Sequence, residues 1–500
     1  MKDKILFLLD MEWIHFGIAK FLQNKHDCEM YAVIDIDPRS RFFFQKQKLV
    51  QFNKIWYYRD HLPKTTKKPD VEYLKYFEEK YKINLWGIAL GERFFYEYNK
   101  FYKFDSDEIL SILEHECRFF ENVLQEIKPD FLIIKLTDSH QSQLLLDLCK
   151  ALGIKSLMMG PTRFGYRYTI YSDYDNTTNF FTMDTGGPNR STVELQNYMN
   201  KYHALKEITT LESTLKFPIW KKIKKYVQYL SSVSSEDYKN YYAHFGRTKL
   251  PIILNFVFLK RFYRKSFVDK NFIRKIEKNT KFIYFPLHYE PERSLLLVAP
   301  FYRNQLTVIS QIARSLPVDY QLYVKEHAVM YLNAWRDISY YKKLLDIPNV
   351  RLVHPTVNHE ELMKNCSLLI TIAGTAGLEV SFYNKPVIVF ADVSYTMLPS
   401  VYRLKNIEEL PQAIKVMLKK EVDLSALNEY VNLIEKNSFE IDLTDLYLKF
   451  DEYFSDEFNS ARSSIPIPKM NSFLEKYNSI FEKLAIEHLN KIQQYKKQNT

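Results

Sequence analysis

Short apolar segments alternate with helix-length amphipathic segments in two separate blocks of this chain, and this alternation constrains the fold more than any other feature. The expected strands lie in 4–10, 30–36, 54–58, 129–139 and 154–160 in the first block and in 281–294, 320–327, 349–355 and 367–390 in the second. Of these segments, 281–294 continues into a polar loop, and 367–390 holds two strands with a turn and a helix between them. Strands that are separated by helices run parallel and lie buried beneath those helices. The sequence therefore predicts an α/β fold with two doubly wound, Rossmann-like domains.

The length of the chain agrees with more than one domain, because 500 residues exceed the roughly 250–300 at which a single core stops growing. We expect an N-terminal Rossmann-like domain over 1–164 and a C-terminal Rossmann-like domain over 276–424. A basic, aromatic, helical insertion is expected over 165–275, and a helical tail without strands over 425–500.

Composition and short motifs exclude several classes of protein. The longest apolar runs, such as IILNFVFL at 252–259, fall well short of the roughly 18–20 residues of a membrane-spanning helix. The 4 cysteines lie far apart, which argues against a disulfide framework and against a zinc site. The start MKDKILFLLD is typical of a buried strand rather than a signal peptide, so we expect a cytoplasmic protein.

The excess positive charge is concentrated in one segment. The chain carries a net charge of +10, and residues 216–275 hold 15 Lys and Arg against 3 Asp and Glu, interleaved with aromatic residues. Residues 220–230 have the pattern of a helix that lies on an anionic membrane surface. A solvated helix packed by its aromatic side chains is the alternative. No nucleic-acid-binding motif accompanies the segment, so no nucleic-acid partner is expected.

The segment 367–390 is the most informative, because a buried strand, a Gly-Thr-Ala-Gly turn, a helix and a further strand follow one another. Gly374 and Gly377 are two of only 11 glycines. A turn without Cβ atoms allows a phosphate to approach backbone N–H groups at the start of a helix, with the Thr375 hydroxyl as a further donor. Glu379 lies one turn further on, where it would accept from ribose hydroxyls. The alternative is that the glycines only permit close packing of the helix on the sheet.

Polar residues follow three other strands of the second block. Lys325 and His327 close one strand and His354 closes another, while His288, Glu292 and Arg293 follow the first. Because the carboxyl ends of parallel strands meet at one edge of a sheet, we expect these side chains near Gly374. Lys325 is suited to pair with a phosphate or a sugar carboxylate, and His327 to donate a hydrogen bond. Solvated strand ends, and a local ion pair between Glu292 and Arg293, are the alternatives.

Residues 281–403 resemble the capsule polysaccharide biosynthesis family, whose members are related to bacterial Kdo transferases and are similar to two-domain glycosyltransferases of the GT-B type. The resemblance is carried by FPLHYEPERS, LYVKEH, NVRLVHP and GTAGLEVSFYNKPVIVF. It implies a nucleotide-sugar donor on the second domain, such as CMP-Kdo or a UDP- or GDP-sugar, with its phosphate at Gly374, Thr375 and Gly377. The acceptor, a polysaccharide or a lipid-linked sugar, would then lie between the domains.

Sugar transfer requires a group that deprotonates the acceptor hydroxyl, and the first domain is expected to supply it. Asp138 and Glu12 are the first candidates, followed by His15. Asp138 has an alternative role as the N-cap of the helix that begins at 140. Charge on the leaving phosphate can be stabilised by Lys325 and a helix N-terminus, so no metal or other cofactor is expected.

Two Asp-x-Asp pairs, Asp35/Asp37 and Asp173/Asp175, have the spacing of carboxylates that hold a metal on a diphosphate. We interpret them instead as turn residues, since the first pair precedes Pro38 and the second lies in an Asn/Asp-rich segment.

Two other functions agree with the same sequence features. A polyol-phosphate transferase of the teichoic-acid type would need catalytic histidines in both domains, such as His15 and His288. A non-catalytic accessory of capsule assembly would bind a nucleotide sugar without turning it over. Attachment at the inner face of the plasma membrane, through 216–275, is compatible with each of the three functions.

Overall fold

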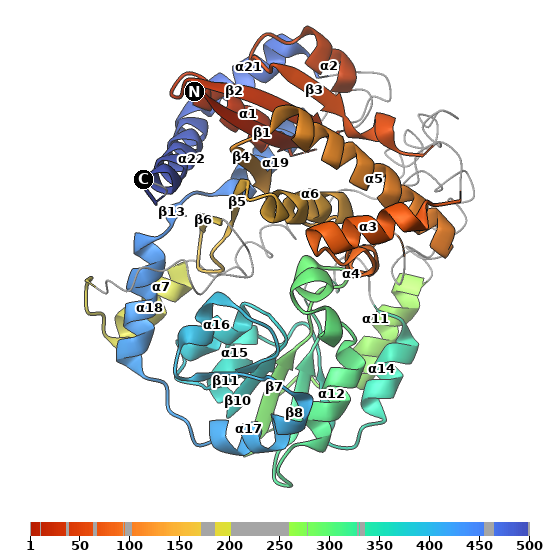
Figure 1. Cartoon of the computed structure of the whole chain (residues 1–500). Helices are drawn as coiled ribbons and strands as arrows, with labels where there is room; N and C mark the ends of the chain where they lie inside the picture. Colours follow the sequence, from red (N-terminus) through yellow and green to blue (C-terminus); the bar gives the residue numbers. More distant parts are fainter. Residues whose placement is uncertain are drawn as a thin grey trace.

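The computed structural model describes residues 2–171, 186–201, 260–454 and 465–498, apart from gaps at 11, 37–39, 64–67, 94, 96–102, 278, 328–329 and 331–335. Two separate, largely parallel sheets form two doubly wound domains, which Figure 1 shows one above the other. The predicted fold class, an α/β fold with two doubly wound, Rossmann-like domains, is confirmed. Within the described residues no helix is both long and apolar enough to cross a membrane.

The sheet of the first domain has seven strands in the order β13-β6-β5-β4-β1-β2-β3. The strands are β1 (Asp3–Leu9), β2 (Cys28–Ile34), β3 (Lys54–Tyr57), β4 (Phe131–Lys135), β5 (Lys155–Pro161), β6 (Arg167–Tyr171) and β13 (Phe439–Glu440). Five of them are parallel, and β6 pairs antiparallel with both β5 and β13.

Alternate residues of β1 pack against two different helical layers. Ile5, Phe7 and Leu9 contribute to the core beneath α1 (Ile14–Leu22), α19 (Leu443–Tyr453), α21 (Ile467–Lys476) and α22 (Asn478–Gln498). Leu6 and Leu8 contribute to the core beneath α3 (Val71–Tyr81), α4 (Leu85–Leu90), α5 (Ser106–Ile127) and α6 (His140–Ala151). This two-sided burial explains why the strand is apolar throughout. The short helix α2 (Arg41–Lys46) follows β2.

The sheet of the second domain has six strands in the order β12-β11-β10-β7-β8-β9. The strands are β7 (Phe282–Pro286), β8 (Gln321–Lys325), β9 (Val350–Val353), β10 (Leu368–Thr371), β11 (Val387–Val389) and β12 (Val401–Arg403), all paired in parallel. The helices are α7 (Thr192–Lys201), α11 (Lys260–Asn271), α12 (Gln305–Arg314), α14 (Ile338–Leu345), α15 (His359–Asn365), α16 (Ala376–Ser381), α17 (Leu410–Met417) and α18 (Leu424–Lys436).

The C-terminal segment joins the two domains. Helix α18 belongs to the core of the second domain, and the chain then returns to the first, where α19, α21 and α22 cover one face of its sheet (Figure 1). The structure differs here from the expected strand-free tail, because β13 pairs with β6. A two-residue strand has no hydrophobic period of its own, so it leaves no pattern in the sequence.

Candidate functional site

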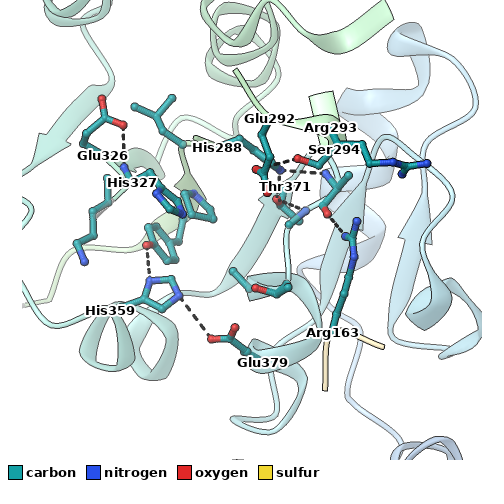
Figure 2. Close-up of a pocket in the computed structure, with 18 of the residues that line it drawn as sticks. Arg163, His288, Glu292, Arg293, Ser294, Glu326, His327, His359, Thr371 and Glu379 are labelled. Carbon is teal, nitrogen blue, oxygen red and sulfur yellow. Dashed lines mark hydrogen bonds and ion pairs between the residues drawn. The ribbon is translucent and has the colours of Figure 1, made fainter. Parts of the chain in front are cut away.

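A cavity of about 350 Å³ lies between the two domains, at the carboxyl ends of central strands. Figure 2 shows Arg163 and Arg293 on one side of it and Glu326 and His327 on the other. The residues that line it are Leu136, Pro161 and Arg163 of the first domain, and Tyr284, Pro286, Leu287, His288, Glu292, Arg293, Ser294, Lys325, Glu326, His327, His359, Thr371, Ala373, Gly374, Thr375, Ala376 and Glu379 of the second. A crevice at strand carboxyl ends is the usual place for a ligand in open α/β sheets.

The bend after β10 directs its first amides inward. The Ala373 N–H donates to Nε2 of His288 at 3.2 Å, and the Gly374 N–H donates to the hydroxyl of Thr371 at 3.1 Å. Among the described residues no acceptor faces the two following amides, those of 375–376. The bend can therefore offer those two amides to a ligand in the cavity, whereas the Gly374 amide is already taken.

Both glycines of the bend are explained by close packing. A Cβ at Gly374 would lie 2.7 Å from Oγ1 of Thr371 and 3.4 Å from Nε2 of His288. A Cβ at Gly377 would lie 2.5 Å from the hydroxyl of Tyr395. Gly374 lines the cavity and Gly377 does not. These distances favour the packing explanation that the sequence left open.

Lys325 is a buried cation that has no counter-ion within the described part of the chain. It ends β8 and lines the cavity, and only 7 % of its surface is exposed. No carboxylate of the described residues forms an ion pair with its ammonium. Burial lowers the pKa of Lys325 to about 8. Because an isolated buried charge is unfavourable, this arrangement favours an anion in the cavity.

The carboxylate next to Lys325 is engaged elsewhere. Glu326 accepts from Nε of Arg336 at 3.0 Å and from the hydroxyl of Tyr341 at 2.6 Å, and Arg336 also pairs with Glu290. These groups raise the pKa of Arg336 although it is buried. Glu326 therefore contributes to the stability of the strand end and leaves the Lys325 charge uncompensated.

His359 connects two other residues of the cavity wall. Its Nδ1 lies 2.7 Å from the hydroxyl of Tyr284, and its Nε2 lies 3.9 Å from Oε2 of Glu379 (Figure 2). Glu379 is in the first turn of α16, so its carboxylate lies beside the bend. The expectation that Glu379 points toward the crevice agrees with this placement.

Two arginines of the cavity wall form contacts between the domains. Arg163, which follows β5, donates to the carbonyl of Ala373, and Arg293 donates to the carbonyl of Thr137 and to its hydroxyl at 3.0 Å. Glu292 accepts from the hydroxyl of Ser294 at 2.9 Å. Burial lowers the pKa of His327, which lies near Glu292.

His354 is not part of the cavity. It follows β9, an edge strand that is separated from β10 by both β7 and β8. Its ring nitrogens contact Asp269 at 2.9 Å and the hydroxyl of Thr356 at 2.6 Å. His354 thus connects α11 to the sheet, and the expectation that it lies near Gly374 is corrected by the strand order.

The acidic candidates of the first domain surround Lys135, at the end of β4. The Lys135 ammonium lies 2.9 Å from Asp10, 3.5 Å from Glu12 and 3.3 Å from Asp138, and these carboxylates raise its pKa. Glu12 also accepts from the hydroxyl of Tyr447 at 2.7 Å. Burial, followed by the charge of Asp10, raises the pKa of Glu12. This group, which we call the Lys135 cluster, does not line the cavity.

His15 is buried in the core between α1 and α22. Burial lowers its pKa to about 4, and a positive charge on His15 would in turn lower the pKa of His488 of α22, which is also buried. The structure does not bring His15 to the cavity. The cap of α6 is also corrected, because Ser139 forms the capping box with Ser142, whereas Asp138 pairs with Lys135.

Some predictions concern residues outside the described part of the chain. These are Asp37, the pair Asp173/Asp175 and most of the basic segment 216–275. Asp35 is described, and its carboxylate accepts from Gln141 at 2.8 Å.

Several residues of the cavity wall have no recognisable signal in the sequence. Tyr284 and Thr371 are ordinary members of apolar strands, and Arg163 and His359 belong to no motif. Only the order of the strands and the approach of the first domain bring them together. His359 lies at the start of a helix that begins Asn-His-Glu-Glu, and this N-terminus gave no sign of a ligand site.

Two solved structures and one family model are similar to this chain. A solved KpsC β-Kdo 2,7-transferase of Thermosulfurimonas dismutans is 11 % identical over 67 % of this chain and 89 % of its own, with a TM-score of 0.30. A UDP-GlcNAc 2-epimerase of Neisseria meningitidis is 11 % identical over 87 % and 99 %, with a TM-score of 0.27. No curated protein matches the chain. The family model described as capsule polysaccharide biosynthesis protein matches residues 179–400, so the predicted resemblance to this family is confirmed over that part of the chain.

Proposed function

We propose that this protein transfers a sugar from a nucleotide-sugar donor to a capsular-type polysaccharide or lipid-linked acceptor. The observation that carries the proposal is the buried ammonium of Lys325, which pairs with no carboxylate of the described residues, in a cavity at strand carboxyl ends. The capsule family match over residues 179–400 supports the same reaction class.

In this reaction the bond between the sugar and the donor phosphate breaks, and the phosphate oxygen keeps the electron pair. Lys325 would compensate the charge that develops on that oxygen, and the amides of 375–376 would donate to the same group. We propose that this charge compensation makes a metal unnecessary. Turnover that is unchanged by a chelator would support this part of the proposal, and turnover that depends on added Mg²⁺ would contradict it.

The acceptor hydroxyl loses a proton during transfer, and we propose that the Lys135 cluster supplies the carboxylate. Because this cluster lies outside the cavity wall, the acceptor would extend from the cluster to the cavity. Glu12 has a raised pKa and therefore a greater tendency to take up a proton than an ordinary glutamate. Asp138 is the more exposed alternative in the same cluster. Glu12→Gln should lower turnover without weakening donor binding, whereas equal loss of both would assign Glu12 a structural role.

The test of the function is a panel of CMP-, UDP- and GDP-sugars with release of free nucleotide as the readout. Wild-type protein should release nucleotide from one donor, and Lys325→Met should not. Lys281→Met is the matched control, because Lys281 is exposed in the same domain and pairs only with Asp319 among the described residues. Binding without release would identify an accessory protein.

A polyol-phosphate transferase has less support, because it would need His15 together with His288. His15 is buried between helices of the first domain, away from the cavity that His288 lines. Turnover of a CDP-polyol in place of a nucleotide sugar would favour this second function.

The basic segment 216–275 supports a further part of the proposal, peripheral attachment at the inner face of the membrane. Replacement of Lys221, Lys222, Lys224 and Lys225 by Glu should release the protein from anionic vesicles. If wild-type protein does not bind such vesicles, this part of the proposal fails and the transfer reaction is unaffected.

A further inference from the structure

The two ring nitrogens of His288 have different surroundings, and these define its tautomer. Nε2 lies 3.2 Å from the backbone nitrogen of Ala373, which can only donate. Oγ1 of Thr371 lies 3.4 Å from the same Nε2 and already accepts from the Gly374 amide, so the hydroxyl proton can also be directed at Nε2. Nε2 is therefore the acceptor nitrogen, and the proton of the neutral ring is on Nδ1.

Nδ1, the ring nitrogen that carries the proton, has different surroundings from Nε2. His288 lines the cavity, is 6 % exposed, and its Nδ1 has no hydrogen-bond acceptor among the described residues. Burial, together with the positive charges nearby, lowers the pKa of His288 to about 3, so the ring remains neutral. A buried donor without an acceptor is unfavourable, and an oxygen atom of a ligand would remove this cost.

The main chain of His288 is held on both sides. Its N–H donates to Oε1 of Gln305 at 2.8 Å, and its carbonyl accepts from Nε2 of Gln305 at 3.2 Å and from the guanidinium of Arg336. Gln305 and Arg336 are both buried. They act as positioning residues, since they fix the backbone from which the imidazole projects.

We infer that His288 is a fixed, neutral hydrogen-bond donor to an oxygen of the anion that pairs with Lys325, and that it accepts no proton in the reaction. The inference rests on the proposed function only for the identity of that anion as the donor phosphate. In this arrangement the bend of 373–374 acts on the ligand indirectly. Its amides polarise His288, one directly and one through Thr371, and the imidazole then contacts the ligand.

Two substitutions separate this role from a purely structural one. In His288→Asn the side-chain nitrogen takes the place of Nδ1 and keeps a donor at that position. In His288→Gln the side-chain oxygen takes the place of Nε2 and keeps the acceptor for the Ala373 amide, whereas the amide nitrogen is one bond further from the backbone than Nδ1, so the donor at the Nδ1 position is lost. We expect His288→Gln to keep the melting temperature of the wild type and to bind inorganic pyrophosphate roughly tenfold or more weakly by calorimetry. His288→Asn should keep wild-type affinity to within about threefold. Wild-type affinity in His288→Gln would overturn the inference.

A second measurement does not depend on the stability of either variant. In protein with ¹⁵N-labelled histidine rings, the His288 signals are those that disappear in His288→Gln. Nδ1 should show the chemical shift of a protonated ring nitrogen and Nε2 that of an unprotonated one, and the reverse pattern would overturn the inference. If both measurements agree with the donor role and no nucleotide sugar is turned over, the proposed function fails while the role of His288 stands.

Discussion

Arg163 of the first domain donates to the carbonyl of Ala373 in the second, at the bend that lines the cavity. Arg293 forms the reciprocal contact from the second domain to Thr137. Both guanidinium groups therefore lie at the interface between the domains and line the cavity. A phosphate is a stronger acceptor than a peptide carbonyl, so ligand binding and the relative position of the domains should influence each other.

Arg163→Ala should accordingly loosen the contact between the domains. We expect a larger radius of gyration in solution scattering, because a hydrogen bond across the cleft is lost. Arg118→Ala is the matched control, since Arg118 is an exposed residue of α5 that pairs with Asp70 and Glu114. Identical scattering curves for the two variants would contradict the prediction.

Anion binding should weaken as the pH rises through the pKa of Lys325, about 8. Below that pH the ammonium is present and attracts the anion, and above it the neutral amine does not. Because the bound anion favours the protonated form, the affinity should fall by up to about tenfold per pH unit above the pKa. Pyrophosphate affinity is measured by calorimetry from pH about 7 to about 10.

The Lys325→Met variant has no ammonium to deprotonate at this position, but pyrophosphate itself still changes its protonation over the same pH range. The difference between the wild-type and variant profiles therefore isolates Lys325. Parallel profiles would show that a group other than Lys325 causes the loss of affinity at high pH. His288 should contribute nothing in this range, since its pKa of about 3 keeps it neutral.

The repeating pattern of strands and helices was sufficient to predict both domains, because each central strand is buried on two faces and is therefore apolar throughout. Lys325 and Gly374 could be placed at one sheet edge because the carboxyl ends of parallel strands meet there. His354 could not be placed correctly, since a sequence does not give the order of parallel strands and β9 is at the edge of its sheet.

The return of the tail to the first domain also had no signal in the sequence. The helical patterns of α19, α21 and α22 are clear, but the surface that they cover depends on the path of the whole chain. Arg163 was missed for a related reason, because its significance depends on a contact with a residue 210 positions away.

The packing of α22 on α1 predicts a sharp effect at Gly17. A Cβ at this position would lie 2.2 Å from Cε1 of Phe481, which is well inside van der Waals contact. Gly17→Ala should lower the free energy of unfolding by about 1–3 kcal/mol, although alanine favours a helix more than glycine does. Urea unfolding measures the change.

Phe481→Leu is the variant that tests the cause. In this background the added methyl group has room, so Gly17→Ala should be neutral or slightly stabilising. An equal loss of stability in both backgrounds would mean that the ring of Phe481 is not the obstacle. The comparison is a double-mutant cycle, which isolates the contact between the two positions.

His15 and His488 should make the first domain sensitive to acid. Burial lowers the pKa of each to about 4, below the ordinary value of 6.5. Because the unfolded chain then binds protons that the folded chain does not, stability should fall as the pH decreases from about 6.5 toward about 4. The groups that face His15 are Asp10, whose charge opposes this effect, and Lys135, whose charge adds to it. His488→Leu should reduce the loss between these pH values in thermal unfolding, whereas an unchanged pH profile would show that His488 is not protonated on unfolding.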